Sequence, residues 1–340
     1  MKRIVILSFF SLLLLYTSAG SIFAAAPTVP KIAFTSVRDG NREIYIMNPD
    51  GSEQVNLTQH DAGDLEPVWS PAGEEILFVS DRDGIRDLYL MNADGSNVQR
   101  VFKKSARREQ PTWAPDGKQI AYSRGTVGNK IIHIATLEKQ TEEPLASGYD
   151  PAWSPDGTEI AFVGGVFGRH RLSLINVHTR RQKRILPEKV IPRQHHPSWS
   201  PTGEKLAFSW NNNPLPIPPD LMQGEIFKVP IAWHDTETIY VVNRDGTNVQ
   251  QIVDEDGPQA TNPAWAPQAD EVLYTQMIDR RLQIFKIDVT SHIRVQLTHI
   301  GDILQANVGG DWFDPATLPV PLESQLLSTT WGEMKRKNSR

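Results

Sequence analysis

One recurring motif constrains the fold of this chain more than any other feature of its sequence. It consists of a proline, a tryptophan two residues later, and a turn of the Pro-Asp-Gly type. Five copies are clear: Pro67–Gly73, Pro111–Gly117, Pro151–Gly157, Pro197–Gly203 and Pro263–Ala269; a weaker sixth surrounds Trp312. The copies recur mostly at intervals in the forties, the size of one four-stranded propeller blade.

Each clear copy is followed by a short apolar segment, as at residues 76–78, 120–122, 160–162, 206–208 and 272–274. A second segment with alternating character comes next, for example Asp87–Asn92. Alternation is typical of a β-strand with different surroundings on its two sides. Asp-Gly pairs such as Asp94-Gly95 then favour hairpin turns, because glycine tolerates a positive φ.

The two ends of the repeat are offset by one unit. Strand-like segments at Lys31–Phe34 and Glu43–Met47 have no motif before them, and the motif at Trp312 has no such segments after it. We therefore predict an all-β, six-bladed β-propeller in which a C-terminal strand completes the first blade. Such closure leaves only short, protected strand edges.

The motif and its strands closely resemble the TolB-like, WD40-like (PD40) propeller repeat, and the resemblance covers roughly residues 31–315. This resemblance implies an extracytoplasmic propeller that binds proteins through one face or through its central channel. Proteins of the TolB type carry a further N-terminal α/β domain, which we do not expect in this chain.

The N-terminus has the order of a secretory signal peptide. Lys2 and Arg3 precede the apolar stretch Ile4–Leu15, and small residues follow from Ser18 to Ala26. The apolar stretch is short for a membrane span, although an uncleaved anchor is the alternative. We expect a signal peptide over residues 1–25, a propeller over 27–315, a C-terminal tail over 316–340, and a periplasmic or secreted location.

The charge balance limits the classes of partner. The formal charge of the chain is −5, and it becomes −7 once Lys2 and Arg3 are removed. Nucleic acids and anionic membranes attract basic surfaces, so we expect neither as the main partner. The chain contains no cysteine, so packing must stabilise it without disulfides. We expect a monomer with no transmembrane segment after signal cleavage.

A polar residue stands immediately before the proline of each clear motif copy. These residues are Glu66, Gln110, Asp150, His196 and Asn262. Because inner strands line the channel of a propeller, we predict that they form a polar binding ring at its mouth. The alternative is that they are only polar ends of strands near solvent.

Two further sets of residues are of types that often carry function. The adjacent pair His195-His196, with Glu66 and Asp150, contains metal-ligand types, but the sequence does not show that they converge. We expect neither a metal nor a cofactor. The motif tryptophans are expected to pack between blades rather than bind a ligand.

One repeat is lengthened between Phe208 and Glu237 by an insertion rich in proline and aromatic residues. Insertions in repeats often decorate a binding face, whereas the alternative is a loop packed on itself. The candidate binding residues in this insertion are Trp210, Asn211, Ile226, Phe227, Trp233 and His234.

Familiar catalytic signatures do not occur in the sequence, neither a Gly-x-Ser-x-Gly elbow nor a His-Glu-x-x-His helix nor a phosphate-binding loop. We predict a non-catalytic, protein-binding scaffold of the cell envelope whose partner is an envelope or extracellular protein. The alternative is a small-ligand or metal-dependent lyase or hydrolase with its site in the channel.

Overall fold

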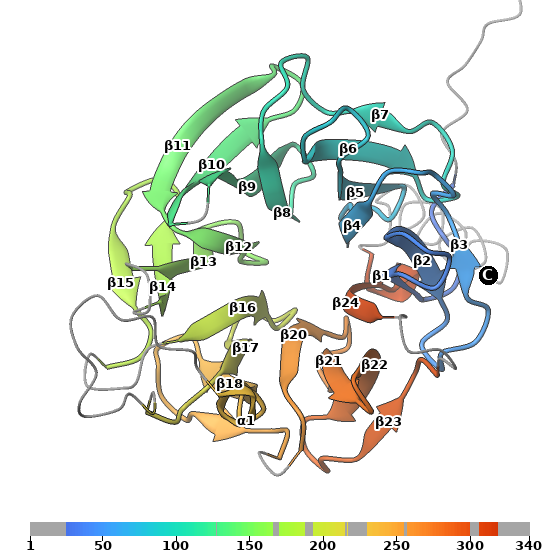
Figure 1. Ribbon diagram of the computed structural model, residues 1–340. Coiled ribbons are helices and arrows are strands. Elements are labelled where there is room, and N and C mark those ends of the chain that lie inside the picture. The colour runs from blue at the N-terminus through green and yellow to red at the C-terminus, as the bar shows by residue number, and fades with distance from the viewer. Residues whose placement is uncertain are drawn as a thin grey trace, which may run out of the picture.

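The computed structural model describes residues 25–126, 128–165, 170–187, 193–214, 216, 230–254, 257–299 and 306–318. These residues form six four-stranded antiparallel sheets, arranged like the blades of a propeller around a central channel (Figure 1). Nearly all of the predicted signal peptide and of the predicted tail lies outside the described residues. Within the described part, no helix has the length and apolar character needed to cross a membrane.

Each blade has one strand at the channel and three that follow it outward, in the order named. Blade 1 contains β24 (Asn307–Phe313), β1 (Lys31–Ser36), β2 (Glu43–Met47) and β3 (Val55–Asn56), and blade 2 contains β4 (Asp64–Trp69), β5 (Glu75–Ser80), β6 (Asp87–Asn92) and β7 (Gln99–Arg100). Blade 3 contains β8 (Arg108–Trp113), β9 (Gln119–Thr126), β10 (Asn129–Thr136) and β11 (Thr141–Ser147), and blade 4 contains β12 (Tyr149–Trp153), β13 (Glu159–Gly164), β14 (Arg171–Asn176) and β15 (Gln182–Arg184). Blade 5 contains β16 (Gln194–Trp199), β17 (Lys205–Trp210), β18 (Thr238–Asn243) and β19 (Gln250–Gln251), and blade 6 contains β20 (Ala260–Trp265), β21 (Glu271–Ile278), β22 (Arg281–Asp288) and β23 (Arg294–Gln296).

The predicted six-bladed fold and its closure are both confirmed. The last strand, β24, pairs antiparallel with β1, and Trp312 lies opposite Ile32. The two ends of the propeller are thus joined within one sheet (Figure 1). This pairing closes the ring, so blades 6 and 1 pack side by side like the other neighbours.

The hydrophobic core is divided among the spaces between neighbouring blades. The five motif tryptophans are all at least nine-tenths buried, as expected. Trp199 of blade 5, for example, packs with Leu172 and Leu174 of blade 4, and its indole N–H donates to the carbonyl of Ala152 across the same interface. Each blade is therefore stabilised mainly by burying its face against the next blade.

The innermost strand of every blade contains a β-bulge at the same place. In blade 2, Leu65 lies opposite Val79 and Val68 opposite Leu77, so that Glu66 and Pro67 together face the single residue Phe78. Equivalent register shifts occur in the other five blades. The residue opposite each bulge is a fully buried aromatic: Phe34, Phe78, Tyr122, Phe162, Phe208 and Tyr274. A bulge re-aims the extra residue and increases the local twist of the strand.

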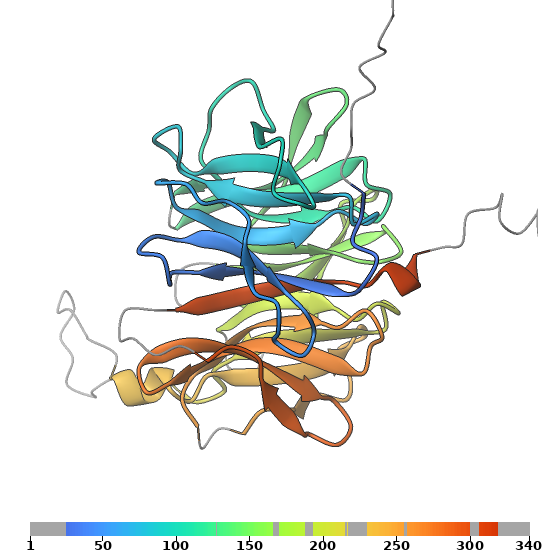
Figure 2. The same cartoon turned by 90° about the vertical axis from the view of Figure 1, so that its right-hand side faces the viewer.

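Two short helices mark opposite faces of the ring (Figure 2). Helix α1 (Ile231–His234) precedes β18, on the face where the innermost strands begin. The 3₁₀ helix η1 (Pro315–Thr317) follows β24, on the face where the innermost strands end.

The turn after the innermost strand gives a test of backbone strain. Its glycine has a positive φ in four blades, 67° at Gly117 for example, whereas blade 6 holds Ala269 at 62°. A side chain is unfavourable in this conformation. We expect Ala269→Gly to raise the free energy of unfolding by about 0.5–1 kcal/mol, measured by urea denaturation.

The matched control is Gly117→Ala. A Cβ at Gly117 meets only Pro71, at 4.0 Å, so the added methyl has space and only the backbone conformation is tested. We expect the free energy of unfolding of this variant to fall by a similar amount. If the free energy of unfolding changed in the same direction in both variants, this account of the turn would be contradicted.

Candidate functional site

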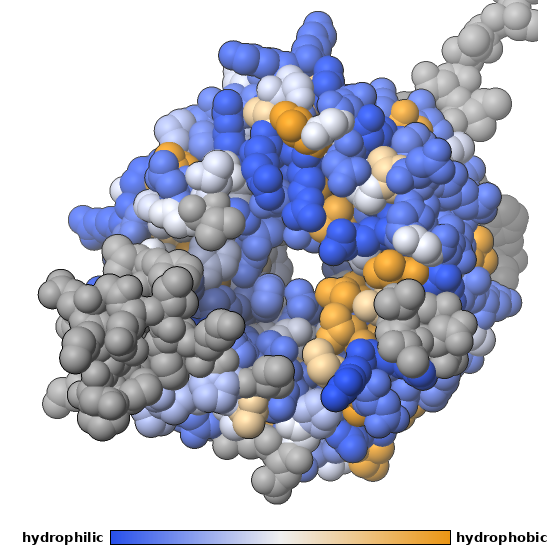
Figure 3. Space-filling view, in the orientation of Figure 1, coloured by the Kyte–Doolittle hydropathy of each residue, from blue (hydrophilic) through white to orange (hydrophobic). Residues whose placement is uncertain are grey.

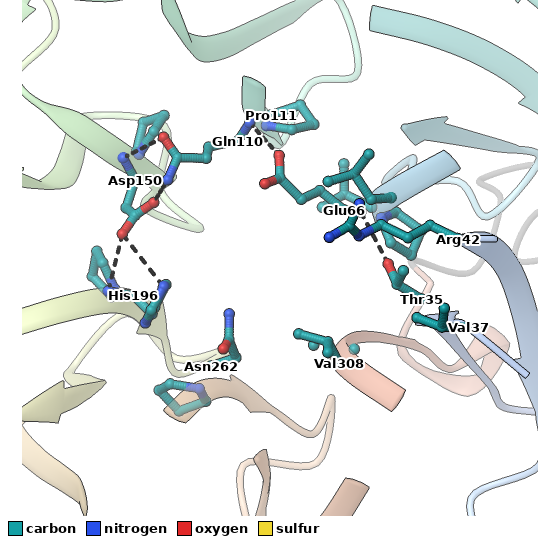
Figure 4. A pocket seen from close by; sticks show the side chains of 18 residues that line it. Thr35, Val37, Arg42, Glu66, Gln110, Pro111, Asp150, His196, Asn262 and Val308 are labelled. Atoms are coloured by element: carbon teal, nitrogen blue, oxygen red, sulfur yellow. Dashed lines mark hydrogen bonds and ion pairs between the residues drawn. The ribbon is translucent and has the colours of Figure 1, made fainter. Parts of the chain in front are cut away.

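The candidate site is a funnel at the mouth of the central channel, where the innermost strands begin. It has a volume of about 380 Å³. The five residues predicted to form a polar ring, Glu66, Gln110, Asp150, His196 and Asn262, all line it, together with the motif prolines that follow them. The structure thus brings residues from five different blades together in one cavity (Figure 4).

The position of these side chains follows from the repeated bulge. Each of the five residues has a left-handed backbone, with φ between 50° and 58°. For residues other than glycine this conformation is uncommon, and it is found where the surrounding structure imposes it. At the equivalent place in blade 1, Gly309 has a φ of 65° and contributes no side chain. We call these six residues the mouth ring.

Hydrogen bonds between blades connect one half of the mouth ring. The backbone N–H of Gln110 donates to Glu66 Oε2 at 2.6 Å, and the N–H of Asp150 donates to Gln110 Oε1 at 3.4 Å. The N–H of His196 in turn donates to Asp150 Oδ2 at 3.4 Å. Each side chain therefore accepts from the backbone of the next blade, which satisfies N–H groups that the bulges remove from strand pairing (Figure 4).

The funnel has a polar side and an apolar side. The apolar side is formed by Val37 and Val308 of blade 1, where the ring closes, and by Leu65 of blade 2. Figure 3 shows a similar division, with hydrophobic residues on one edge of the central opening and hydrophilic residues around most of the remainder. A ligand in this funnel would meet hydrogen-bond acceptors on one side and aliphatic carbon on the other.

Two carboxylates give the polar side its electrostatic character. Burial raises the pKa of Glu66 to about 7, and the negative charges of Asp150 and Glu109 add to this, although the N–H of Gln110 opposes it. Lys130 binds Glu109 at 3.0 Å and Gln110 Oε1 at 3.1 Å. The polar side therefore contains one carboxyl group, that of Glu66, whose protonation changes near neutral pH, and Arg42 lines the funnel beside it (Figure 4).

The metal-ligand types noted in the sequence do not come together as a cluster. His196 Nε2 lies 3.8 Å from Asp150 Oδ2, and His195 Nδ1 instead bonds the hydroxyl of Tyr149 at 3.0 Å. Burial, with the positive charges of neighbouring groups, lowers the pKa of His195 to about 3. Among the described residues, no three His, Asp or Glu side chains are placed to hold one metal ion.

The described residues of the insertion form its base. Trp210, Asn211 and Trp233 are at least nine-tenths buried. Asn211 Nδ2 donates to the carbonyl of Trp233 at 2.6 Å, and the Trp233 indole N–H donates to the carbonyl of Pro214 at 2.9 Å. These bonds tie the two ends of the insertion together. His234 is partly exposed beside Trp233, whereas Ile226 and Phe227 lie outside the described residues.

Sequence reasoning did not identify Thr35, Val37, Val308 or Gly309 as part of the site. Alignment of the weak sixth motif on Trp312 places Gly309 level with Glu66, which is a signal that could have found it. The neighbouring positions have no such signal. Thr35 Oγ1 accepts from the N–H of Glu66 at 3.1 Å, a contact between the neighbouring blades 1 and 2.

The pKa of Glu66 predicts how stability depends on pH. The folded protein retains a proton that the unfolded chain releases above about pH 4.5, so this group stabilises the fold most at low pH. That contribution is lost as pH rises through about 7. We expect Glu66→Gln to become more stable relative to the parent protein between pH 5 and 8, by about 1–3 kcal/mol, measured by urea denaturation.

Glutamine keeps an oxygen that accepts from Gln110, so the variant changes only the ionisable group. The exposed Glu204, replaced by glutamine, is the matched control, and its relative stability should not follow this pH trend. A Glu66→Gln variant with the same pH dependence as the parent would contradict the assignment.

Comparison with known proteins agrees with this fold. A family model described as the TolB beta propeller domain (PD40) matches residues 19–202. The Tol-Pal system protein TolB of Geobacter sulfurreducens is 45% identical over 49 residues, which make up 14% of this chain and 11% of that protein. The match therefore spans about a tenth of that relative's length.

Two solved structures share the fold at 17% identity. TolB from Acinetobacter baumannii has a TM-score of 0.66, with coverage of 83% of this chain and 66% of that one. The putative TolB from Agrobacterium tumefaciens has a TM-score of 0.59, with coverage of 84% and 91%. This chain thus spans slightly less than two thirds of the Acinetobacter protein. Because the family model matches more than half of the chain, the chain belongs to the TolB β-propeller (PD40) family.

Proposed function

We propose that this protein is an exported, non-catalytic scaffold of the cell envelope, and that it binds a segment of a partner protein at the mouth of its channel. One observation carries the proposal. Side chains from five blades and an apolar surface from blade 1 converge on a single funnel, although they are far apart in the sequence.

The chemistry of the funnel suits a polypeptide. Glu66 and Asp150 offer carboxylate oxygens to N–H donors, and Gln110 and Asn262 offer amides that both donate and accept. Val37 and Val308 provide a surface for an aliphatic or aromatic side chain. A protein segment carries both kinds of group at short spacing, and an apolar anchor beside oriented polar contacts is a common arrangement in binding sites.

The proposal of export rests on the charged, apolar and small-residue order of residues 1–25. Membership in the TolB propeller family, and the name Tol-Pal system protein of one relative, favour an envelope location and a protein partner. On the same basis the partner is an envelope or extracellular protein, and the scaffold acts as a monomer.

The insertion is a second candidate surface. Its described aromatic residues are buried in its base, where they hold the two ends together. Any contact with a partner would therefore be made by the residues between these ends, which include Ile226 and Phe227, and by His234. Because the base and the funnel have different residues, separate variants distinguish the two surfaces.

The test of the channel site is to obstruct the funnel. Val37 lines it and is partly exposed, so Val37→Trp fills space on the apolar side. Val55→Trp is the matched control, because Val55 is 50% exposed on β3 at the outer edge of the same blade. Partners captured from an envelope fraction are identified with the parent protein, and their affinities are then measured by calorimetry. We expect Val37→Trp to weaken binding at least about tenfold, and Val55→Trp to leave it unchanged.

A third variant lacks residues 217–229 but keeps Asn211, Pro214 and Trp233, which form the base of the insertion. If this deletion abolishes binding and Val37→Trp does not, the binding surface is the insertion and the channel proposal is wrong. If the three variants and the parent protein all capture the same partners with the same affinity, neither surface is the site.

A further inference from the structure

A second cavity lies between blades 5 and 6, at the face opposite the funnel. Strand β20 begins near the mouth and ends at Trp265, which lines this cavity, so the two sites are at opposite ends of the strand. The cavity has a volume of about 600 Å³. Its lining combines strands β17 to β20 with the turn between β22 and β23: Lys205, Val241, Asn248, Gln250, Gln251, Ile252, Trp265, Val289, Thr290 and His292.

The floor of this cleft is apolar and its walls are polar. Val241, Ile252 and Trp265 form the floor and belong to the core between the two blades. The walls carry neutral hydrogen-bonding groups, among them the amides of Asn248 and Gln250. The amide of Gln251 is instead hydrogen-bonded to the carbonyl of Val253 and the hydroxyl of Tyr240. An apolar floor with a few polar groups around it is a common lining for a small-molecule site.

Lys205 is the exceptional residue of the cleft. It is the first residue of the second strand of blade 5, and in four other blades the equivalent side chain has a partner inside the protein. These pairs are Lys31 with Glu53, Gln119 with Thr136, Glu159 with Arg244 and Glu271 with Lys286. Lys205 is partly buried, yet within the described part of the chain its ammonium group has no hydrogen bond or ion pair.

The charge of the lining residues is positive. Lys205 brings an ammonium group and none of the ten lining residues is acidic, whereas the imidazole of His292 lies near the carboxylate of Asp288 just outside the lining. A cation held at the edge of an apolar cavity favours a ligand that supplies the missing negative charge. The neighbouring apolar floor favours a ligand that also carries a hydrocarbon group.

We propose that this cleft binds a small amphiphilic carboxylate, an organic anion whose carboxyl group is attached to an apolar chain. The carboxylate contacts the ammonium group of Lys205. The apolar chain lies along Val241, Ile252 and Trp265, and the amide of Gln250 contacts the polar end. The volume is within the range that small-molecule sites occupy in proteins. The site is separate from the funnel, so it does not depend on the function proposed there.

The test uses octanoate as the probe on the whole protein, followed by nuclear magnetic resonance. The signals to observe are the indole N–H of Trp265 and the backbone amides of Gln250 and Gln251. We expect saturable shifts with octanoate, weaker binding of 1-octanol, which lacks the charge, and little binding of acetate, which lacks the chain. Octylamine should bind most weakly of the eight-carbon probes, because its charge is repelled by Lys205.

Variants separate the charge of Lys205 from its apolar stem. Lys205→Met keeps the stem and should lower the affinity for octanoate about tenfold while 1-octanol binds as before. Lys205→Arg should retain octanoate binding. Lys118 is exposed near the corresponding turn of blade 3, so Lys118→Gln is the control and should leave the affinity for octanoate unchanged. Thermal unfolding of each variant verifies that it is folded.

Equal affinity for octanoate and 1-octanol would overturn the proposal, as would an unchanged octanoate affinity in Lys205→Met. The absence of shifts at Trp265, Gln250 and Gln251 at millimolar octanoate would overturn it too. None of these results would affect the funnel, which the Val37→Trp variant tests independently.

Discussion

The bulge in the innermost strand of every blade is the feature on which both the fold and the candidate site depend. It places two residues opposite one buried aromatic ring, and the first of the two adopts a left-handed backbone. For a residue with a side chain, this conformation costs about 1–2 kcal/mol. The cost recurs around the ring, at Glu66 and at four equivalent positions. Hydrogen bonds from one blade to the backbone of the next help to offset it.

Packing between blades is the second element of this design. Five interfaces bury a motif tryptophan and the sixth, between blades 6 and 1, contains the partly buried Trp312; pairing of β24 with β1 makes these two blades neighbours. A chain without cysteine is thereby held together by a closed series of similar contacts. Every blade packs against two others. A change that destabilises one blade therefore weakens both of its interfaces, which favours cooperative unfolding.

The departures from symmetry are the places where function is proposed. The motif of blade 1 has Gly309 where the others have a polar side chain, and the apolar side of the funnel lies beside it. Blade 5 carries the insertion, and it also carries Lys205, whose position in four other blades is occupied by a side chain with a partner. A regular repeat specifies the scaffold, and these single positions give its two faces different chemistry.

The sequence by itself determined the number of blades, the closure by a C-terminal strand and the position of the polar ring. Those features follow from local patterns, because a motif at fixed spacing puts Glu66 and Asp150 at equivalent places in their blades. The tertiary structure alone decided which groups touch. It placed Val37 and Val308 beside the ring, buried Trp233 in the base of the insertion and left Lys205 facing a cleft. These contacts join residues that are distant in the sequence, and their geometry exists only after the strands and blades that carry them have packed together.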